Sequence, residues 1–258
     1  MLVRTKYYNY FANSVKEALI FKLNFFLLFF QPFLFFYIKF SVWKYIFNSG
    51  FSNNSPLSFE KTILYSIVIQ SIQFIFPLSI ANNFSDDVRT GYFSIYQLRP
   101  VQYPLVLLAK YMALLILRSL FLAVPLVIGA IYYNLSTTAI FSLLTALPLS
   151  IICCAAMEFI FGALSFYIIK PQSIYTIVMT ILGLLGGKIL PIQYFPEPLR
   201  QIKYYNPLYA IYGVPADRMI GEISWAQSTM IQCSWCTVLI LIATFIYRHG
   251  VSKYEASN

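Results

Sequence analysis

Histidine is nearly absent from this sequence: the 258 residues contain one, His249. A serine or cysteine nucleophile that depends on histidine therefore has no base in the apolar segments, and a histidine-rich metal site cannot form there. We expect His249 to be a basic residue of the C-terminal tail. We expect no catalytic residue and no metal site in the chain.

Charge is also scarce. Only 10% of the residues are charged and 59% are hydrophobic, whereas a soluble domain carries about 25% charged residues. The apolar runs are about 20 residues or longer and do not alternate with polar residues, which favours helices over a barrel. The sequence therefore predicts an all-α polytopic membrane protein that forms one domain over residues 1–258.

Cysteine occurs four times, always inside an apolar run. Cys233-Ser-Trp-Cys236 has the CxxC spacing of redox and metal sites, but no second ligand pair accompanies it. We expect these two residues, with Cys153 and Cys154, to pack in the core without disulfides.

A nucleotide site is missing as well. Gly186-Gly187-Lys188 resembles the end of a phosphate loop, but the earlier glycine and the following Ser or Thr are replaced by Leu182 and Ile189. Any ATP that the protein uses must then be bound by another chain. The net charge of +9 does not indicate nucleic acid binding, because Lys and Arg lie mostly beside the ends of apolar runs, where they orient a membrane protein.

Six apolar runs predict six membrane-spanning helices. We expect an amphipathic helix on the membrane surface at residues 1–18, before the first span. The spans are expected at residues 19–40, 61–81, 105–132, 139–169, 173–190 and 228–247. Pro32 should kink the first span, and the glycines near the end of the fifth should permit close helix approach.

The longest break between spans covers residues 191–227 and contains five prolines. It is too apolar and aromatic for a free loop. We expect short helical turns that re-enter the membrane or lie against the bundle, with their broken backbone shielded by protein.

The distribution of Lys and Arg predicts the orientation. Both terminal segments are basic, and an even number of spans places both termini on one side, so the positive-inside rule puts them in the cytoplasm. Residues 81–104 then face the cytoplasm and residues 191–227 face outward, although the outer segment contains Arg200, Lys203 and Arg218. We expect no cleavable signal peptide.

Residues 81–104 form a polar stretch between spans two and three, rich in aromatic side chains. A solvated loop does not need so many aromatics. The stretch is either a docking element for a soluble partner or an interfacial loop that joins two spans, and its composition leaves both readings open.

The local pattern of this stretch predicts two short helices. Ser85 or Asp86 should cap the first, with carboxylates in its first turn, and Gly91 should end it. A second helical turn over residues 92–99 should stop at Pro100.

Two charges remain inside the spans, Arg118 in span three and Glu158 in span four. A lone charge at mid-bilayer costs at least about 2.5–3.5 kcal/mol. Because their depths are similar, we expect Arg118 and Glu158 to pair, or at least to face the bundle interior. A pair that fixes helix register is favoured over a substrate site.

Several motifs together resemble a protein family. They are Asp87-Val88-Arg89-Thr90-Gly91 leading to Leu98-Arg99-Pro100, Asn206-Pro207-Leu208-Tyr209 followed by Pro215 and Gly221, and the tail Gly250-Val251-Ser252-Lys253-Tyr254-Glu255-Ala256-Ser257. Their order and spacing, over essentially the full chain, resemble the permease subunits of bacterial type-2 ATP-binding-cassette (ABC) exporters, in an uncharacterised subgroup.

This resemblance implies that residues 81–104 contain the coupling helix that docks into a cleft on a separate ATPase subunit. Four charged residues would make polar contacts there, and three aromatic residues would pack. The residues implied are Asp86, Asp87, Arg89, Gly91, Tyr92, Phe93, Tyr96, Leu98, Arg99 and Pro100.

The resemblance also implies the rest of the mechanism. Two permeases, identical or related, would form a path between them in the bacterial plasma membrane and rock between states as two ATPases close on ATP and Mg. This chain itself would hold no cofactor. The outer segment would form a gate that includes Pro196, Asn206, Pro207 and Pro215. A peptide or a hydrophobic, lipid-like compound is the expected cargo.

Two alternatives remain on the residues alone. A membrane-embedded enzyme of lipid metabolism would need a cluster of polar groups at one depth, and only Arg118 and Glu158 are available. An ion-coupled secondary transporter usually has more spans, broken helices and intramembrane carboxylates.

Overall fold

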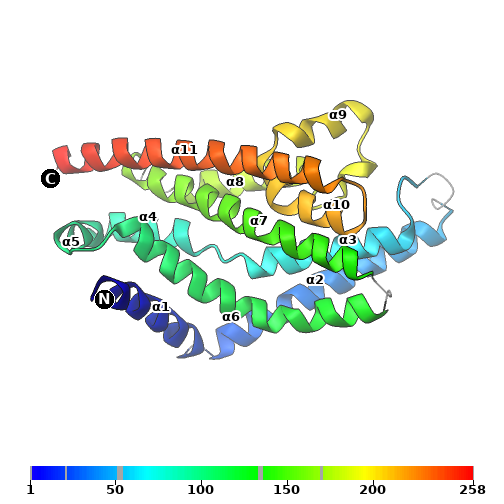
Figure 1. Ribbon diagram of the computed structural model, residues 1–258, viewed down its shortest axis with the longest axis horizontal. Helices are drawn as coiled ribbons and strands as arrows, with labels where there is room; N and C mark the ends of the chain where they lie inside the picture. The colour runs from blue at the N-terminus through cyan, green and yellow to red at the C-terminus, as the bar shows by residue number, and fades with distance from the viewer. Residues whose placement is uncertain (1, 21, 51–54, 133–135, 169–170, 258) are drawn as a thin grey trace.

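The computed structural model describes residues 2–20, 22–50, 55–132, 136–168 and 171–257, and all the regular secondary structure within them is helical (Figure 1). The longer helices are α1 (Leu2–Ile20), α2 (Lys22–Asn48), α3 (Phe59–Ile75), α4 (Ser79–Arg89), α6 (Tyr103–Tyr132), α7 (Thr137–Ala163), α8 (Pro171–Leu185) and α11 (Trp225–Ser257). The shorter ones are α5 (Tyr92–Leu98), η2 (Leu164–Phe166), η3 (Ile192–Tyr194), α9 (Glu197–Gln201), η4 (Ile202–Tyr205), η5 (Tyr209–Gly213) and α10 (Val214–Met219).

Four helical segments of the described residues are long and apolar enough to cross a membrane. They are Phe59–Arg89, Tyr103–Leu120, Thr137–Phe166 and Trp225–Glu255. The prediction of an all-α membrane protein is therefore confirmed. Beside them, α2 has 27 residues and α8 is a shorter apolar helix of 15 residues.

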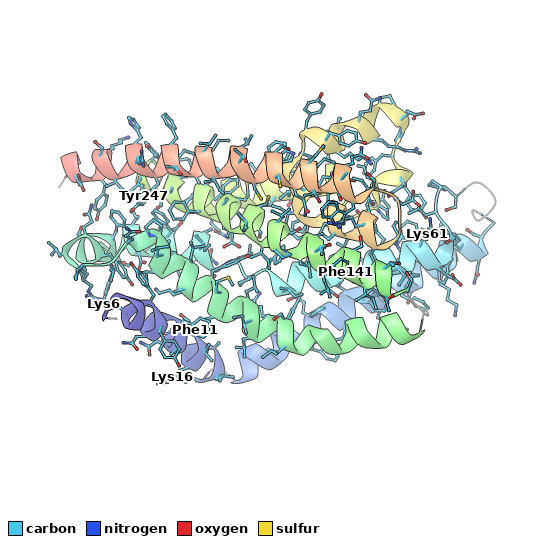
Figure 2. The ribbon with its side chains drawn as sticks, viewed as in Figure 1. Lys6, Phe11, Lys16, Lys61, Phe141 and Tyr247 are labelled. Atoms are coloured by element: carbon cyan, nitrogen blue, oxygen red, sulfur yellow. The ribbon has the colours of Figure 1, made fainter. Side chains whose placement is uncertain are left out.

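The two ends of the bundle differ. Figure 1 shows α5 at the end where α1 begins and α11 finishes, while α9 and α10 lie at the other end. Lys61 and Tyr247 mark these opposite ends in Figure 2. Between them, α7 is the central helix, because it packs against α11, α4 and α10.

Several helix boundaries differ from those predicted. The first span continues as α2 to Asn48, with Pro32 inside the helix, and the end predicted for the fourth span, at residue 169, lies outside the described residues. At the C-terminus, α11 continues to Ser257 instead of ending near Tyr247. Contacts with α5 explain this extension, since the ring of Tyr254 lies 5.3 Å from the ring of Phe93.

The outer segment has the predicted character. Its short helices, from η3 to α10, are interrupted by prolines, and residues 206–220 are all buried. Both η5 and α10 pack against α7 and α3. The broken backbone is therefore covered by protein, as the prediction required.

One glycine sets how closely α8 approaches η5. A Cβ on Gly186 would lie 2.9 Å from the backbone N of Tyr209 and 2.9 Å from the carbonyl O of Leu182. Backbone atoms cannot move aside as a flexible side chain can, so this contact requires glycine.

We predict that Gly186→Ala lowers the free energy of unfolding by about 1–3 kcal/mol, the cost of overpacking a tight contact. Gly183→Ala is the matched control one turn earlier, because the atoms nearest to its added Cβ belong to side chains, those of Lys188 at 3.1 Å and Leu208 at 3.8 Å. Thermal unfolding in detergent measures both. Equal losses in the two variants would contradict the close-approach argument.

Candidate functional site

Span two, predicted as one helix over residues 61–81, is broken. α3 ends at Ile75 and α4 begins at Ser79. Pro77 has no backbone N–H and disfavours helical geometry in the residue before it, and Phe76 is extended, with φ −80° and ψ 104°. The break leaves backbone groups unpaired at two helix ends inside the bundle.

Glu158 of α7 binds the N-terminal end of α4. Its Oε2 accepts hydrogen bonds from the backbone N–H groups of Ile80 at 2.9 Å and Ala81 at 3.4 Å. The carboxylate is fully buried. It caps α4 from a neighbouring helix, at the end where the helix dipole favours negative charge.

Arg118 of α6 binds the other side of the break. Its Nη1 donates to the carbonyl O of Phe74 at 3.2 Å, in the last turn of α3, and the guanidinium lies 5.7 Å from the centre of the Phe74 ring. A cation is favourable at this end of a helix.

Arg118 and Glu158 therefore do not form the direct ion pair that we expected. In the described part of the chain, the close ion pairs join Lys61 to Glu222 and Arg89 to Asp86. Arg118 and Glu158 instead bind the two helix ends that flank one break, so they act at the same place through different backbone partners. Pro77 is the residue that could have signalled this break in the sequence.

The polar end of α4 also differs from the prediction. Because the helix begins at Ser79, Asp86 and Asp87 lie in its last turns and neither Ser85 nor Asp86 caps it. Their charges are compensated by side chains: Arg89 Nη2 lies 3.0 Å from Asp86 Oδ1, and the Tyr103 hydroxyl donates to Asp87 Oδ2 at 2.9 Å.

The predicted end of this helix is confirmed. Gly91 has φ +79°, a left-handed conformation that suits glycine. It separates α4 from α5, which ends at Leu98, just before Arg99 and Pro100.

α5 has two distinct faces. Phe93, 1% exposed, and Tyr96 point into the bundle, whereas Tyr92, Ile95 and Leu98 are exposed, Leu98 at 88%. The spacing of three residues places these three side chains on one helix face. Phe93 and Tyr96 are thus unavailable to a partner, contrary to the expectation that they pack against an ATPase. Ile95, which was not in the expected set, is exposed on the face of α5 that points away from the bundle.

An aromatic cluster fixes the inner face of α5 to the bundle. The Phe93 ring lies 5.0 Å from the rings of Tyr103 and Phe166. Phe84 of α4 lies 5.3 Å from Phe159 and from Phe166. Rings from α4, α5, α6, α7 and η2 thus form one packed unit.

The flanks of α5 are held by α1 and α11. Arg99 Nη1 donates to the Tyr10 hydroxyl at 3.2 Å, while Gln97 Nε2 donates to Glu255 Oε1 at 2.8 Å. Burial raises the pKa of Tyr96 to about 12, so this phenol stays neutral beneath the Arg99 guanidinium, 5.8 Å from its ring centre. These contacts hold α5 against α1 and α11, so it is not a free loop.

The four predicted gate residues differ in burial. Pro196 is exposed and precedes α9, whereas Asn206, Pro207 and Pro215 are buried. Asn206 Nδ2 donates to the carbonyl O of Leu182 at 2.7 Å, and its Oδ1 accepts from the N–H of Leu208 at 2.9 Å.

Sequence reasoning missed two buried charges in this segment. Asp217 accepts hydrogen bonds from the Tyr209 hydroxyl at 2.7 Å and from Gln193 at 2.8 Å. The adjacent Arg218 donates to Ser142 and Thr145 of α7. Both charges anchor α10 within the bundle.

The cysteines only partly match the expected core positions. Cys153, Cys154 and Cys236 are buried, but Cys233 is exposed. Cys236 approaches Cys153 of α7, with 2.7 Å between the sulfurs, so the close contact does not lie within the CxxC sequence. Among the described residues, no group of three His, Cys, Asp or Glu side chains could hold a metal ion.

We predict that Glu158→Leu lowers the free energy of unfolding by about 1–3 kcal/mol for each backbone N–H left unpaired. Glu158→Gln keeps an acceptor oxygen and should lose less. Thermal unfolding in nanodiscs compares them, with Met157→Leu as the control for a buried change on the same turn. If the Leu and Gln variants unfolded at the same temperature, Glu158 would not cap α4.

Comparison with known proteins agrees with these features. The family model described as ABC-2 family transporter protein matches residues 26–258, a range that includes the break, α4, α5 and the outer segment. No curated protein gives a significant match. Members of this family are membrane components of ABC transporters, have no catalysis of their own and work with an ABC ATPase. The chain therefore belongs to the ABC-2 family, as the membrane permease of an ABC transporter.

Proposed function

We propose that α5 is the coupling helix through which an ATPase drives this permease. The observation that supports the proposal most directly is the exposed apolar face formed by Tyr92, Ile95 and Leu98 at one end of the bundle. An apolar row flanked by exposed charges, here Asp86 and Arg89, suits a cleft on a folded partner. A partner that seats on this row buries apolar surface that is otherwise in water.

The coupling motion would pass through the aromatic cluster. Phe84 and Phe93 tie α4 and α5 together and to the rings around them. A push on α5 would therefore move α4 with it, and the break at Phe76–Leu78 is the natural hinge for that movement. Pro77 has no N–H with which to continue the helical hydrogen bonds across this point.

The remaining parts of the proposal concern topology and assembly. Six spans, with α2 first and α8 fifth, place both termini and α5 in the cytoplasm of a bacterial cell and the outer segment at the opposite surface. Two permeases form the path, and ATP and Mg are bound by the ATPase. The direction is export, and the cargo is a peptide or a lipid-like compound. The buried outer segment, anchored by Asn206 and Arg218, is the outer gate.

We predict that Leu98→Glu reduces capture of the ATPase by the purified permease about tenfold or more, since it places a charge on the most exposed apolar side chain of the docking face. The copurified ATPase is measured after mild detergent extraction. Tyr205→Glu is the control, because Tyr205 is 83% exposed in η4 of the outer segment. Undiminished capture by Leu98→Glu would refute the docking role of α5.

Charge reversal at the end of α4 gives a second test. Asp86→Lys should uncouple substrate-stimulated ATP hydrolysis or abolish binding, and the double exchange Asp86→Arg with Arg89→Asp should not restore it. The double exchange keeps the local ion pair but inverts the charges that the partner meets. Full recovery in the double variant would mean that the pair serves only the stability of α4.

A further inference from the structure

A stripe of exposed side chains runs along the last turns of α11, the red end of the chain in Figure 1. Leu241 and Phe245 are 65% and 72% exposed. His249 and Lys253 follow at the same spacing of four residues and are also exposed. Because residues four apart lie one above another on a helix, these four side chains form one stripe. It is apolar at its beginning and basic at its end.

Arg248 belongs to the basic part of the stripe. It is exposed and follows Phe245 by three residues, so it lies on the same face of α11. Arg248 is also the first charged residue of this helix. Charges beside the end of an apolar run mark the level of the lipid head groups. The stripe therefore passes from acyl-chain depth to head-group depth.

Tyr167 fixes the basic part of the stripe from a second element. It follows η2 and is exposed. Its ring is nearly parallel to the imidazole of His249, at 13° with 6.4 Å between the centres. The ammonium of Lys253 lies 5.0 Å from the centre of the same Tyr167 ring. The imidazole is also parallel to the Phe245 ring, at 6.3 Å. His249 and Lys253 thus have defined positions.

The basic side chains of the stripe have no counter-ion. Within the described part of the chain, Arg248, His249 and Lys253 form no side-chain ion pair or hydrogen bond. Glu255 is the one carboxylate of α11, and it accepts a hydrogen bond from Gln97 of α5. It also follows Lys253 by two residues, which places it on another face of the helix. An anionic group can therefore bind the stripe without displacing a partner.

The ligand must match both parts of the stripe. Leu241 and Phe245 belong to the apolar segment Trp225–Glu255, which is long enough to cross a membrane. A water-soluble anion would use only the basic part. A phospholipid carries its phosphate directly beyond its acyl chains, so one molecule spans both parts. Basic clusters next to a membrane helix suit anionic head groups.

We propose that Arg248, His249 and Lys253 bind the phosphate of an anionic phospholipid whose acyl chains lie along Leu241 and Phe245. The guanidinium can contact two phosphate oxygens, and an imidazole N–H can donate to a third. The bound lipid would brace the helix whose last turns support α5. The inference rests on the proposed topology only in assigning this lipid to the cytoplasmic leaflet, and it does not depend on ATPase docking.

The test measures phospholipid binding to the purified permease in detergent without the ATPase, so its result is separate from the role of α5. The probes are dioleoylphosphatidylglycerol, zwitterionic dioleoylphosphatidylcholine with the same chains, and glycerol phosphate, a head group without chains. We expect Arg248→Gln and Lys253→Gln each to weaken phosphatidylglycerol binding about fivefold, which equals about 1 kcal/mol for each lost cation. Phosphatidylcholine should bind more weakly, and equally in all variants.

Two further variants separate a defined site from diffuse surface charge. Lys16→Gln is the matched control, because it removes one exposed cation from α1 and should leave lipid binding unchanged. Tyr167→Leu changes no charge but removes the ring that fixes His249 and Lys253. It should weaken phosphatidylglycerol binding about threefold. Unfolding temperatures of all these variants should match the wild type, which separates loss of binding from loss of fold.

The contrary outcomes are distinct. Equal phosphatidylglycerol binding by the wild type and the double Gln variant would overturn the site, as would an equal loss in Lys16→Gln. Displacement of the lipid by millimolar glycerol phosphate would assign the cations to a water-soluble anion. If Phe245→Ser dissociated a permease dimer and left lipid binding unchanged, the stripe would be a contact between two copies of the chain instead.

Discussion

In the hydrocarbon of a bilayer, each backbone N–H and C=O must find its partner within the protein. This constraint explains the least regular part of the structure. Pro77 interrupts the apolar segment Phe59–Arg89, and the two helix ends that result receive Arg118 on the carbonyl side and Glu158 on the N–H side. The two intramembrane charges thus compensate a broken backbone, and their signs follow the helix dipole at each end.

The same arrangement makes α7 a link between distant regions. Its Glu158 holds the start of α4, its Ser142 and Thr145 hold Arg218 of the outer segment, and its Phe159 packs on Phe84 near α5. A displacement of α4 or of the outer segment therefore moves side chains that contact the same helix, α7. Energetic coupling between distant sites is carried by packed side chains and rigid elements that have two arrangements, and the hinge that we propose at Pro77 would supply the second one.

Features governed by local chemistry could be predicted from the sequence. The helical class, the turn at Gly91, the stop at Pro100 and the buried short helices of the outer segment all follow from composition and from Gly and Pro.

Features governed by distant partners could not be predicted from the sequence. The start of α4 depends on Glu158 in another helix, so the expected cap at Ser85 or Asp86 was wrong. Which aromatic residues of α5 face inward depends on rings in other elements, so the burial of Phe93 and Tyr96 could not be predicted.

The length of α11 has a consequence for the membrane around the protein. Its 33 residues form a rod of about 50 Å, whereas the hydrocarbon layer is about 30 Å thick. In the topology that we propose, the last turns, with Glu255 against Gln97 of α5, extend beyond the lipid tails as a stalk. The contacts that hold α5 on this stalk are entirely within the protein. A thinner or thicker bilayer would change how far the stalk protrudes but would leave the shape of its tip the same.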